Sequence, residues 1–260
     1  MRFGICRGLN DFEAFSSAVV AGVDYLETGF GCLVDYDDAK FSDCKAMLES
    51  LNFKCIAANG FIPGDMKLVG DSVDYGAIAE YLDKGFERAA ALGIEKIVLG
   101  SGKARSFNED FSSEKAKEQL AYFLSEFASP RAKKIGAIIV LEPLRFNESS
   151  MLHTVAEGVE IAALSGADNV FSLADLYHVY GNNDSICGMT EFKGKVRHSH
   201  IAEPVARRYP MGTDKEEVIY IYREFLNSLE LAGCETCSIE AHTDDFSADI
   251  KPAIELLKSL

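Results

Sequence analysis

The stretch Gly136-Ala-Ile-Ile-Val-Leu-Glu142 decides the fold, because its pattern of glycine, apolar run and terminal polar residue recurs along the chain. The glycine predicts the end of a helix, since a left-handed residue there turns the chain back to a sheet. The short apolar run is typical of a buried strand, and Glu142 ends it with a charge. The stretch therefore predicts the junction between a helix and a buried strand.

Seven further runs of strand type alternate with longer segments that have helical spacing of apolar residues. Together with Ala137–Glu142, the predicted strands are Phe3–Cys6, Tyr25–Thr28, Lys54–Ala58, Lys96–Gly100, Val170–Asp175, Val196–Ile201 and Thr236–Glu240. A crossover helix between successive strands makes those strands parallel, so eight such units close most simply into a (β/α)8 barrel.

The predicted fold is thus of the α/β class, a single TIM barrel domain over residues 1–260. An open doubly wound sheet is the alternative architecture. It usually carries a glycine-rich phosphate loop after the first strand, and Arg7-Gly8-Leu9-Asn10 is not such a loop. Two small domains would also fit the length, but α/β barrels commonly run to about 250 residues and no linker divides the chain.

Composition describes a folded acidic protein. The 260 residues include 26 Lys and Arg against 41 Asp and Glu, a formal charge of −15, and 48% are hydrophobic. No run of basic residues exceeds two, so we expect no nucleic-acid partner. No apolar stretch approaches the roughly 18 residues of a membrane span, so we expect no membrane partner either.

Cysteine usage indicates a reducing compartment. The seven cysteines are scattered and odd in number, which does not suit a disulfide framework. Cys234 and Cys237 lack the second pair that a zinc knuckle needs. The first residues contain no apolar run long enough for a secretion signal, and we expect a cytoplasmic protein.

Polar residues end the last four predicted strands. Glu142, Asp175 and Glu240 are terminal residues, and His200 is next to last in Val196–Ile201. In a TIM barrel these strand ends build the active site, so the four side chains should converge. Crowded carboxylates repel one another, and a divalent cation removes that cost. Oxygen ligands with one imidazole suit Mn²⁺ or Mg²⁺, with Co²⁺ or Zn²⁺ as alternatives, and the pattern predicts one such ion.

Simpler interpretations compete for single residues. Glu142 or Asp175 alone could cap the next helix, but four polar strand ends at once favour a metal site. His198 lies one strand period deeper in the predicted barrel, where we expect a buried, hydrogen-bonded core histidine. Lys103 and Arg105 are expected in a solvated loop rather than in a phosphate clamp.

Five motifs that span most of the chain carry a family resemblance: Gly100-Ser-Gly-Lys-Ala-Arg105, Leu141-Glu-Pro-Leu-Arg-Phe-Asn-Glu148, Leu173-Ala-Asp-Leu-Tyr-His178, His198-Ser-His-Ile-Ala-Glu203 followed by Arg207-Arg208, and Ser238-Ile-Glu240. Jointly they resemble the sugar phosphate isomerase/epimerase superfamily of xylose isomerase-like TIM barrels. Within it, they are most similar to the ketose 3-epimerase branch typified by D-tagatose 3-epimerase.

The resemblance implies a metal-dependent sugar isomerase or epimerase. The metal ligands that it implies are Glu142, Asp175, His200 and Glu240. The substrate contacts that it implies are Glu148, His178 and Arg207. The loop before Arg207 is one residue longer than in the epimerases, so Arg208 competes for that role. His153-Thr-Val155 replaces the family's Asn-Thr-Val, which changes the expected sugar contacts.

These residues permit proton transfer through an enediolate. A metal ion polarises a ketose carbonyl, one of Glu142 and Glu240 removes the neighbouring proton, and the other delivers a proton to the opposite face. The result is epimerisation of that carbon. Delivery to the neighbouring carbon would instead give aldose–ketose isomerisation, and loss of water would give an inosose dehydratase-type lyase.

Two other functions remain as alternatives, a DNA endonuclease of the same superfamily and a non-catalytic sugar-binding protein. Endonuclease IV acts on DNA with three zinc ions, and five histidines with a charge of −15 disfavour that chemistry. A non-catalytic sugar-binding barrel is the alternative from another class. We expect a sugar or sugar phosphate as the small-molecule partner and, by analogy, a homodimer or homotetramer.

Overall fold

The computed structural model describes all residues from 1 to 260 and contains eight parallel strands. Each lies within one residue of its predicted bounds at either end. The strands are β1 (Arg2–Cys6), β2 (Tyr25–Gly29), β3 (Cys55–Asn59), β4 (Lys96–Leu99), β5 (Ile138–Leu141), β6 (Val170–Asp175), β7 (Val196–Ile201) and β8 (Thr236–Ile239).

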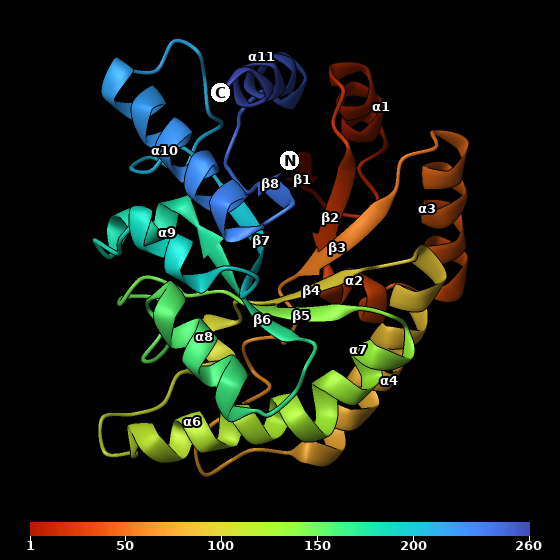
Figure 1. Ribbon diagram of the computed structural model, residues 1–260. Coiled ribbons are helices and arrows are strands. Elements are labelled where there is room, and N and C mark those ends of the chain that lie inside the picture. The colour runs from red at the N-terminus through yellow and green to blue at the C-terminus, as the bar shows by residue number, and fades with distance from the viewer.

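The strands pair in chain order and β1 pairs with β8, so the sheet is a closed barrel. This confirms the predicted TIM barrel and excludes the open doubly wound sheet. Helices surround the strands, and the first and last strands lie side by side (Figure 1). No helix is both long and apolar enough to cross a membrane.

The helices lie between strands as predicted. They are α1 (Phe12–Ala21), α2 (Phe30–Asp35), α3 (Asp38–Ser50), α4 (Tyr75–Leu92), α5 (Gly102–Arg105), α6 (Ser113–Tyr122), α7 (Ser129–Lys134), α8 (Val155–Leu164), α9 (Leu176–Gly181), α10 (Glu216–Ala232) and α11 (Phe246–Ser259). A π-helical segment, Phe123–Ala128, joins α6 to α7. Gly93 and Gly136 follow helices with φ of 75° and 73°, the left-handed conformation that the sequence predicts.

The barrel interior is layered below the strand ends. Side chains two residues apart on a strand face the same side, so each predicted metal ligand has a neighbour one layer deeper. On β5 and β6 these neighbours are apolar, Val140 and Leu173, and both are fully buried. On β7 and β8 they are polar, His198 and Ser238, and both are also fully buried. The layer beneath the site is therefore apolar on the side of β5 and β6 and polar on the side of β7 and β8.

Candidate active site

The four predicted metal ligands lie together at the carboxyl end of the barrel. Glu142 and Glu240 directly follow β5 and β8, Asp175 ends β6, and His200 is next to last in β7. One potential ligand atom from each lies within 4.8 Å of those from the other three. Four consecutive strands thus bring three carboxylates and one imidazole to one point, as the strand-end pattern predicts.

His200 lies between the two glutamates. Its Nδ1 is 3.1 Å from Glu142 Oε1 and 3.3 Å from Glu240 Oε2. The ring is fully buried, and the two glutamates approach the same nitrogen from the ends of β5 and β8. Asp175 completes the group, with its Oδ1 accepting a hydrogen bond from the Tyr177 amide at 2.9 Å.

The electrostatics of the group depend on burial and on neighbouring charges. Burial raises the pKa of Asp175, and the nearby imidazole of His178 only partly opposes this effect. Burial would also raise the pKa of Glu240, but His200 and Arg207 outweigh it and lower that pKa to about 2. For His200, burial would lower the pKa, but Glu27 and Glu240 raise it well above its ordinary value.

These residues fit a divalent cation. Asp175 Oδ2 is buried and has no hydrogen-bond partner, which is costly for a carboxylate oxygen unless a cation or donor approaches it. The donor set contains carboxylate oxygens and one imidazole nitrogen and no thiolate, a set suited to Mn²⁺ or Mg²⁺. Glu142, Asp175, His200 and Glu240 would hold the ion.

Of the three predicted substrate contacts, His178 and Arg207 lie at the cluster, and Glu148 lies in a neighbouring loop. His178, on α9, is 1% exposed, and its Nε2 lies 3.4 Å from Asp175 Oδ2. Neither ring nitrogen has a hydrogen-bond partner, and Nε2 is the nitrogen that faces the cluster. Glu148 is half-buried in the loop between β5 and α8, and its carboxylate makes no hydrogen bond within the chain.

Arg207 rather than Arg208 faces the cluster. Arg207 Nη2 lies 2.6 Å from Glu240 Oε2 and 3.7 Å from Asp175 Oδ2. Its guanidinium also stacks over the Tyr177 ring, 4.8 Å from the ring centroid. Arg208 pairs with Asp214 instead. Arg207 itself adopts a left-handed backbone conformation, with φ of 52°.

Arg105 corrects the sequence prediction. It was expected in a solvated loop, but it is fully buried on α5. Its guanidinium donates to the carbonyl oxygens of Gly100 and Glu142 at 2.7 and 2.8 Å. It also donates to those of Met151 and Leu152 at 3.1 and 3.4 Å. All these contacts are inside the protein, so the guanidinium links the loops that follow β4 and β5 and is not available to bind a phosphate.

Gly100 lies directly beside the Glu142 carboxylate. A Cβ atom built there would lie 2.2 Å from Glu142 Oε2, well inside contact distance. Gly100 therefore leaves the space that the Glu142 carboxylate occupies. This gives a physical reason for the glycine that begins the motif after the fourth strand.

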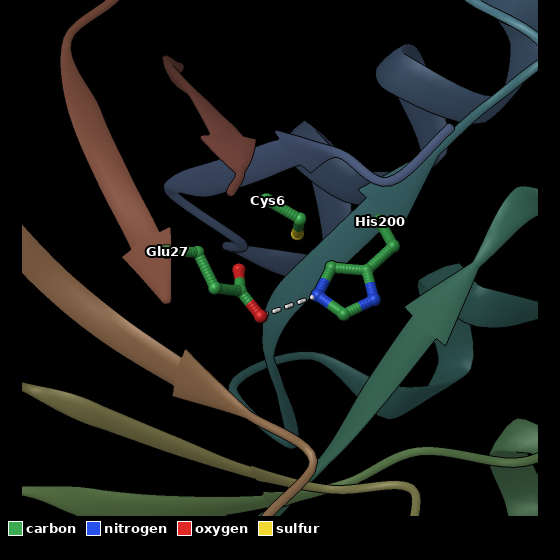
Figure 2. A group of neighbouring side chains, drawn as sticks. All are labelled: Cys6, Glu27 and His200. Atoms are coloured by element: carbon green, nitrogen blue, oxygen red, sulfur yellow. Dashed lines mark hydrogen bonds and ion pairs between the residues drawn. The ribbon is translucent and has the colours of Figure 1, made fainter. Parts of the chain in front are cut away.

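Three further polar residues face the site. Asn59, at the end of β3, has its Nδ2 3.3 Å from Glu240 Oε1. Cys6, Glu27 and His200 form a second group with potential ligand atoms within 4.8 Å of one another, drawn in Figure 2. A charged residue inside the buried strand β2 was the signal in the sequence for Glu27, but the strand pattern alone gave it no partner.

The fold and the cluster define a TIM barrel with a candidate metal centre at the carboxyl ends of its strands. A family model described as xylose isomerase-like TIM barrel matches residues 15–260. The chain belongs to this family, which confirms the resemblance carried by its motifs. No curated protein matches the chain.

Solved structures of sugar epimerases share the fold at low sequence identity. D-Allulose 3-epimerase from Methylomonas sp. is 18% identical, with a TM-score of 0.83 over 100% of this chain and 97% of that one. The E. coli 3-keto-D-glucoside 4-epimerase YcjR is 17% identical, with a TM-score of 0.81 over 100% of both chains. D-Psicose 3-epimerase from Clostridium cellulolyticum H10 is 19% identical, with a TM-score of 0.77 over 100% and 96%.

Proposed function

We propose that this protein is a metal-dependent sugar isomerase of the epimerase type, acting as a ketose 3-epimerase. The observation that carries the proposal is the convergence of Glu142, Asp175, His200 and Glu240, whose ligand atoms lie within 4.8 Å of one another. Two glutamates in one such group provide the two proton carriers that inversion of a carbon requires. The epimerases among the structures of the same fold support this choice.

When bound, a divalent cation would polarise the ketose carbonyl and the neighbouring hydroxyl, and so acidify the adjacent C–H bond. Asp175 and His200 would mainly hold the ion. We propose Mn²⁺ or Mg²⁺, because three of the four side chains offer hard oxygen ligands.

Glu142 and Glu240 are the proposed acid and base. They extend from β5 and β8 and lie 3.1 and 3.3 Å from the same His200 nitrogen, so they face one volume from different strands. One enters as the carboxylate and removes the proton on carbon 3. The other enters as the carboxylic acid and delivers its proton to the opposite face of that carbon. Solvent exchange then resets both groups.

His178, Arg207 and Glu148 are the proposed substrate contacts. The unpartnered imidazole of His178 can hydrogen-bond a sugar oxygen, and Arg207 offers a cation beside the developing negative charge. Glu148 has a free carboxylate in the loop above β5, where it can accept a sugar hydroxyl. To contact a substrate, the Arg207 guanidinium must give up part of its ion pair with Glu240.

The same residues define the competing reactions. A carbonyl on carbon 3, as in the substrate class named for YcjR, would direct the same proton transfer to carbon 4. Delivery to the neighbouring carbon would make the enzyme an aldose–ketose isomerase, and loss of water would make it an inosose dehydratase-like lyase. A non-catalytic sugar-binding barrel would bind without turnover.

Product analysis distinguishes these reactions. The Mn²⁺-loaded protein is incubated with a panel of ketoses, 3-keto glycosides, inososes and their phosphates, and the products are identified by NMR. We expect a ketose inverted at carbon 3, and loss of that product after chelation of the metal. An aldose, a 4-epimer or a dehydrated product would assign the corresponding alternative. Sugar-dependent thermal stabilisation with no product would favour the binding protein.

Two further proposals concern the cellular context. All seven cysteines are free, and three of the four that are buried lie in or next to strands of the barrel, which fits a reducing compartment such as the cytoplasm.

We also propose a homodimer or homotetramer. Light scattering at micromolar concentration that gave the monomer mass of 28.4 kDa would reject the oligomer.

A further inference from the structure

We propose that Glu27 is a positioning residue for the metal centre: it holds the proton of His200 on Nε2 and so presents Nδ1 to the metal ion. The inference rests on the proposed metal-binding role of His200. Glu27 itself lies on β2, is fully buried, and contacts both His200 and the deeper His198.

The contacts of Glu27 support this assignment directly. Its Oε1 lies 2.9 Å from His200 Nε2, the contact drawn as a dashed line in Figure 2. Its Oε2 lies 2.8 Å from His198 Nε2 and accepts a hydrogen bond from Ser238 Oγ at 2.6 Å. One carboxylate thus meets both histidines of the His198-Ser-His200 motif and a serine of β8.

A metal ion binds only the neutral form of a histidine, and for neutral rings the protons of this network can be assigned in one consistent way. An ionised carboxylate only accepts hydrogen bonds, so each nitrogen that faces Glu27 must carry a proton. His198 is then protonated on Nε2, and its Nδ1 accepts from Thr236 Oγ1 at 2.8 Å. His200 is likewise protonated on Nε2, which leaves the lone pair of Nδ1 free.

That lone pair points at the proposed metal site. His200 Nδ1 lies 3.1 Å from Glu142 Oε1 and 3.3 Å from Glu240 Oε2, the two carboxylates with which it would share the ion. A ring protonated on Nδ1 would oppose metal binding and leave a lone pair facing the Glu27 carboxylate. Glu27 therefore selects the ring form that can act as a ligand.

The barrel makes this positioning rigid. Glu27, His198 and His200 all lie on strands rather than on loops, and all are fully buried. Glu27 and His200 are 173 residues apart in the chain, so closure of the barrel is what brings them together. Loss of an outer carboxylate behind a ligating histidine typically costs about 10–100-fold in metal affinity.

Glu27→Gln is the test variant and Cys6→Ser is its matched control. Glutamine has nearly the same size but one acceptor oxygen, so it cannot accept from both histidines, and its NH2 group meets an N–H donor. Cys6 belongs to the same group of neighbouring atoms in Figure 2, yet its thiol makes no hydrogen bond with His200. Mn²⁺ affinity is measured by calorimetry, and folding by thermal unfolding of the metal-free proteins.

We expect Glu27→Gln to bind Mn²⁺ about 10–100-fold more weakly and Cys6→Ser to bind as the wild type does. Unchanged affinity in Glu27→Gln would overturn the inference while leaving the metal site intact. Absence of Mn²⁺ binding by the wild type would instead refute the proposed metal site. Loss of binding in Cys6→Ser, with a thiolate charge-transfer band on Co²⁺ titration, would place the ion at Cys6 and overturn the inference.

A second measurement needs no variant and decides the question even where Glu27→Gln does not fold. Long-range ¹H–¹⁵N spectra of the Zn²⁺-loaded wild type report which ring nitrogen of each histidine carries the proton. We expect Nε2–H for both His198 and His200. A proton on Nδ1 of His200, or metal coordination through its Nε2, would contradict the role assigned to Glu27.

Discussion

Arg105→Met removes a buried cation while keeping a side chain of similar reach, and its effect can be worked out from four hydrogen bonds. The carbonyl oxygens of Met151 and Leu152 keep a second donor, from Ser149 Oγ at 2.9 Å and the Leu144 amide at 3.0 Å. Those of Gly100 and Glu142 have no donor other than Arg105. The substitution therefore leaves two buried carbonyl groups unsatisfied.

Each unsatisfied group costs about 1–3 kcal/mol, so the two together destabilise the fold by about 2–6 kcal/mol. Burial lowers the pKa of Arg105 to about 10, a sign that the buried charge is itself unfavourable. Methionine removes that unfavourable term, which places the expected loss in the lower half of the range. Because Glu142 loses its backbone anchor, we also expect weaker metal binding.

Denaturant unfolding of the metal-free protein measures the stability, and calorimetry with Mn²⁺ measures the affinity. Arg131→Met is the control, because Arg131 pairs at 2.7 Å with Asp83, whose side chain is 67% exposed. Such a surface pair is worth less than about 1 kcal/mol. An Arg105→Met protein as stable as Arg131→Met, with unchanged Mn²⁺ affinity, would refute the role given to Arg105.

Three further predictions concern the site and the core. Asp175→Asn removes a charge at nearly constant volume, so it should weaken metal binding severely without unfolding the protein; full divalent metal content by elemental analysis would contradict this. Gly100→Ala should displace the Glu142 carboxylate from its present position and weaken Mn²⁺ binding by calorimetry, whereas an unchanged affinity would show that the carboxylate has room to move. Burial raises the pKa of Cys237 from 9.0 to about 12, so the folded state keeps this proton after the unfolded state has lost it. Its contribution to stability is therefore full below pH 9.0 and falls by about 1.4 kcal/mol per pH unit between pH 9.0 and about 12, and Cys237→Ala should reduce that slope in alkaline unfolding curves.

The sequence was sufficient for the features that local pattern controls. A glycine, an apolar run and a polar terminus, as in Gly136–Glu142, identify both the strand and the direction in which it ends. Parallel strands then place Asp175 and His200 at the same end of the barrel as Glu142 without any knowledge of packing. This is why the strand bounds and the composition of the cluster could be predicted together.

Features that depend on closure of the barrel or on loop conformation could not be predicted in this way. Glu27 reads as one polar residue in a strand until β2 and β7 are brought together across the barrel. Arg105 reads as a surface residue because its carbonyl partners come from loops with no periodic pattern. The choice of Arg207 over Arg208 likewise depends on one left-handed residue in an irregular loop.

Isotope exchange tests the central claim most directly, because it follows the proton that the two glutamates are proposed to carry. The Mn²⁺-loaded wild type is incubated in D₂O with a ketose that it converts. We expect deuterium on the inverted carbon of the product. Glu240→Gln should give neither label nor product, since an amide cannot act as a base. Removal of a general base costs about 10²–10⁴-fold, and loss of a metal ligand places the effect at or beyond the upper end. Full activity of Glu240→Gln, or inversion by the wild type without deuterium incorporation, would contradict the two-glutamate mechanism.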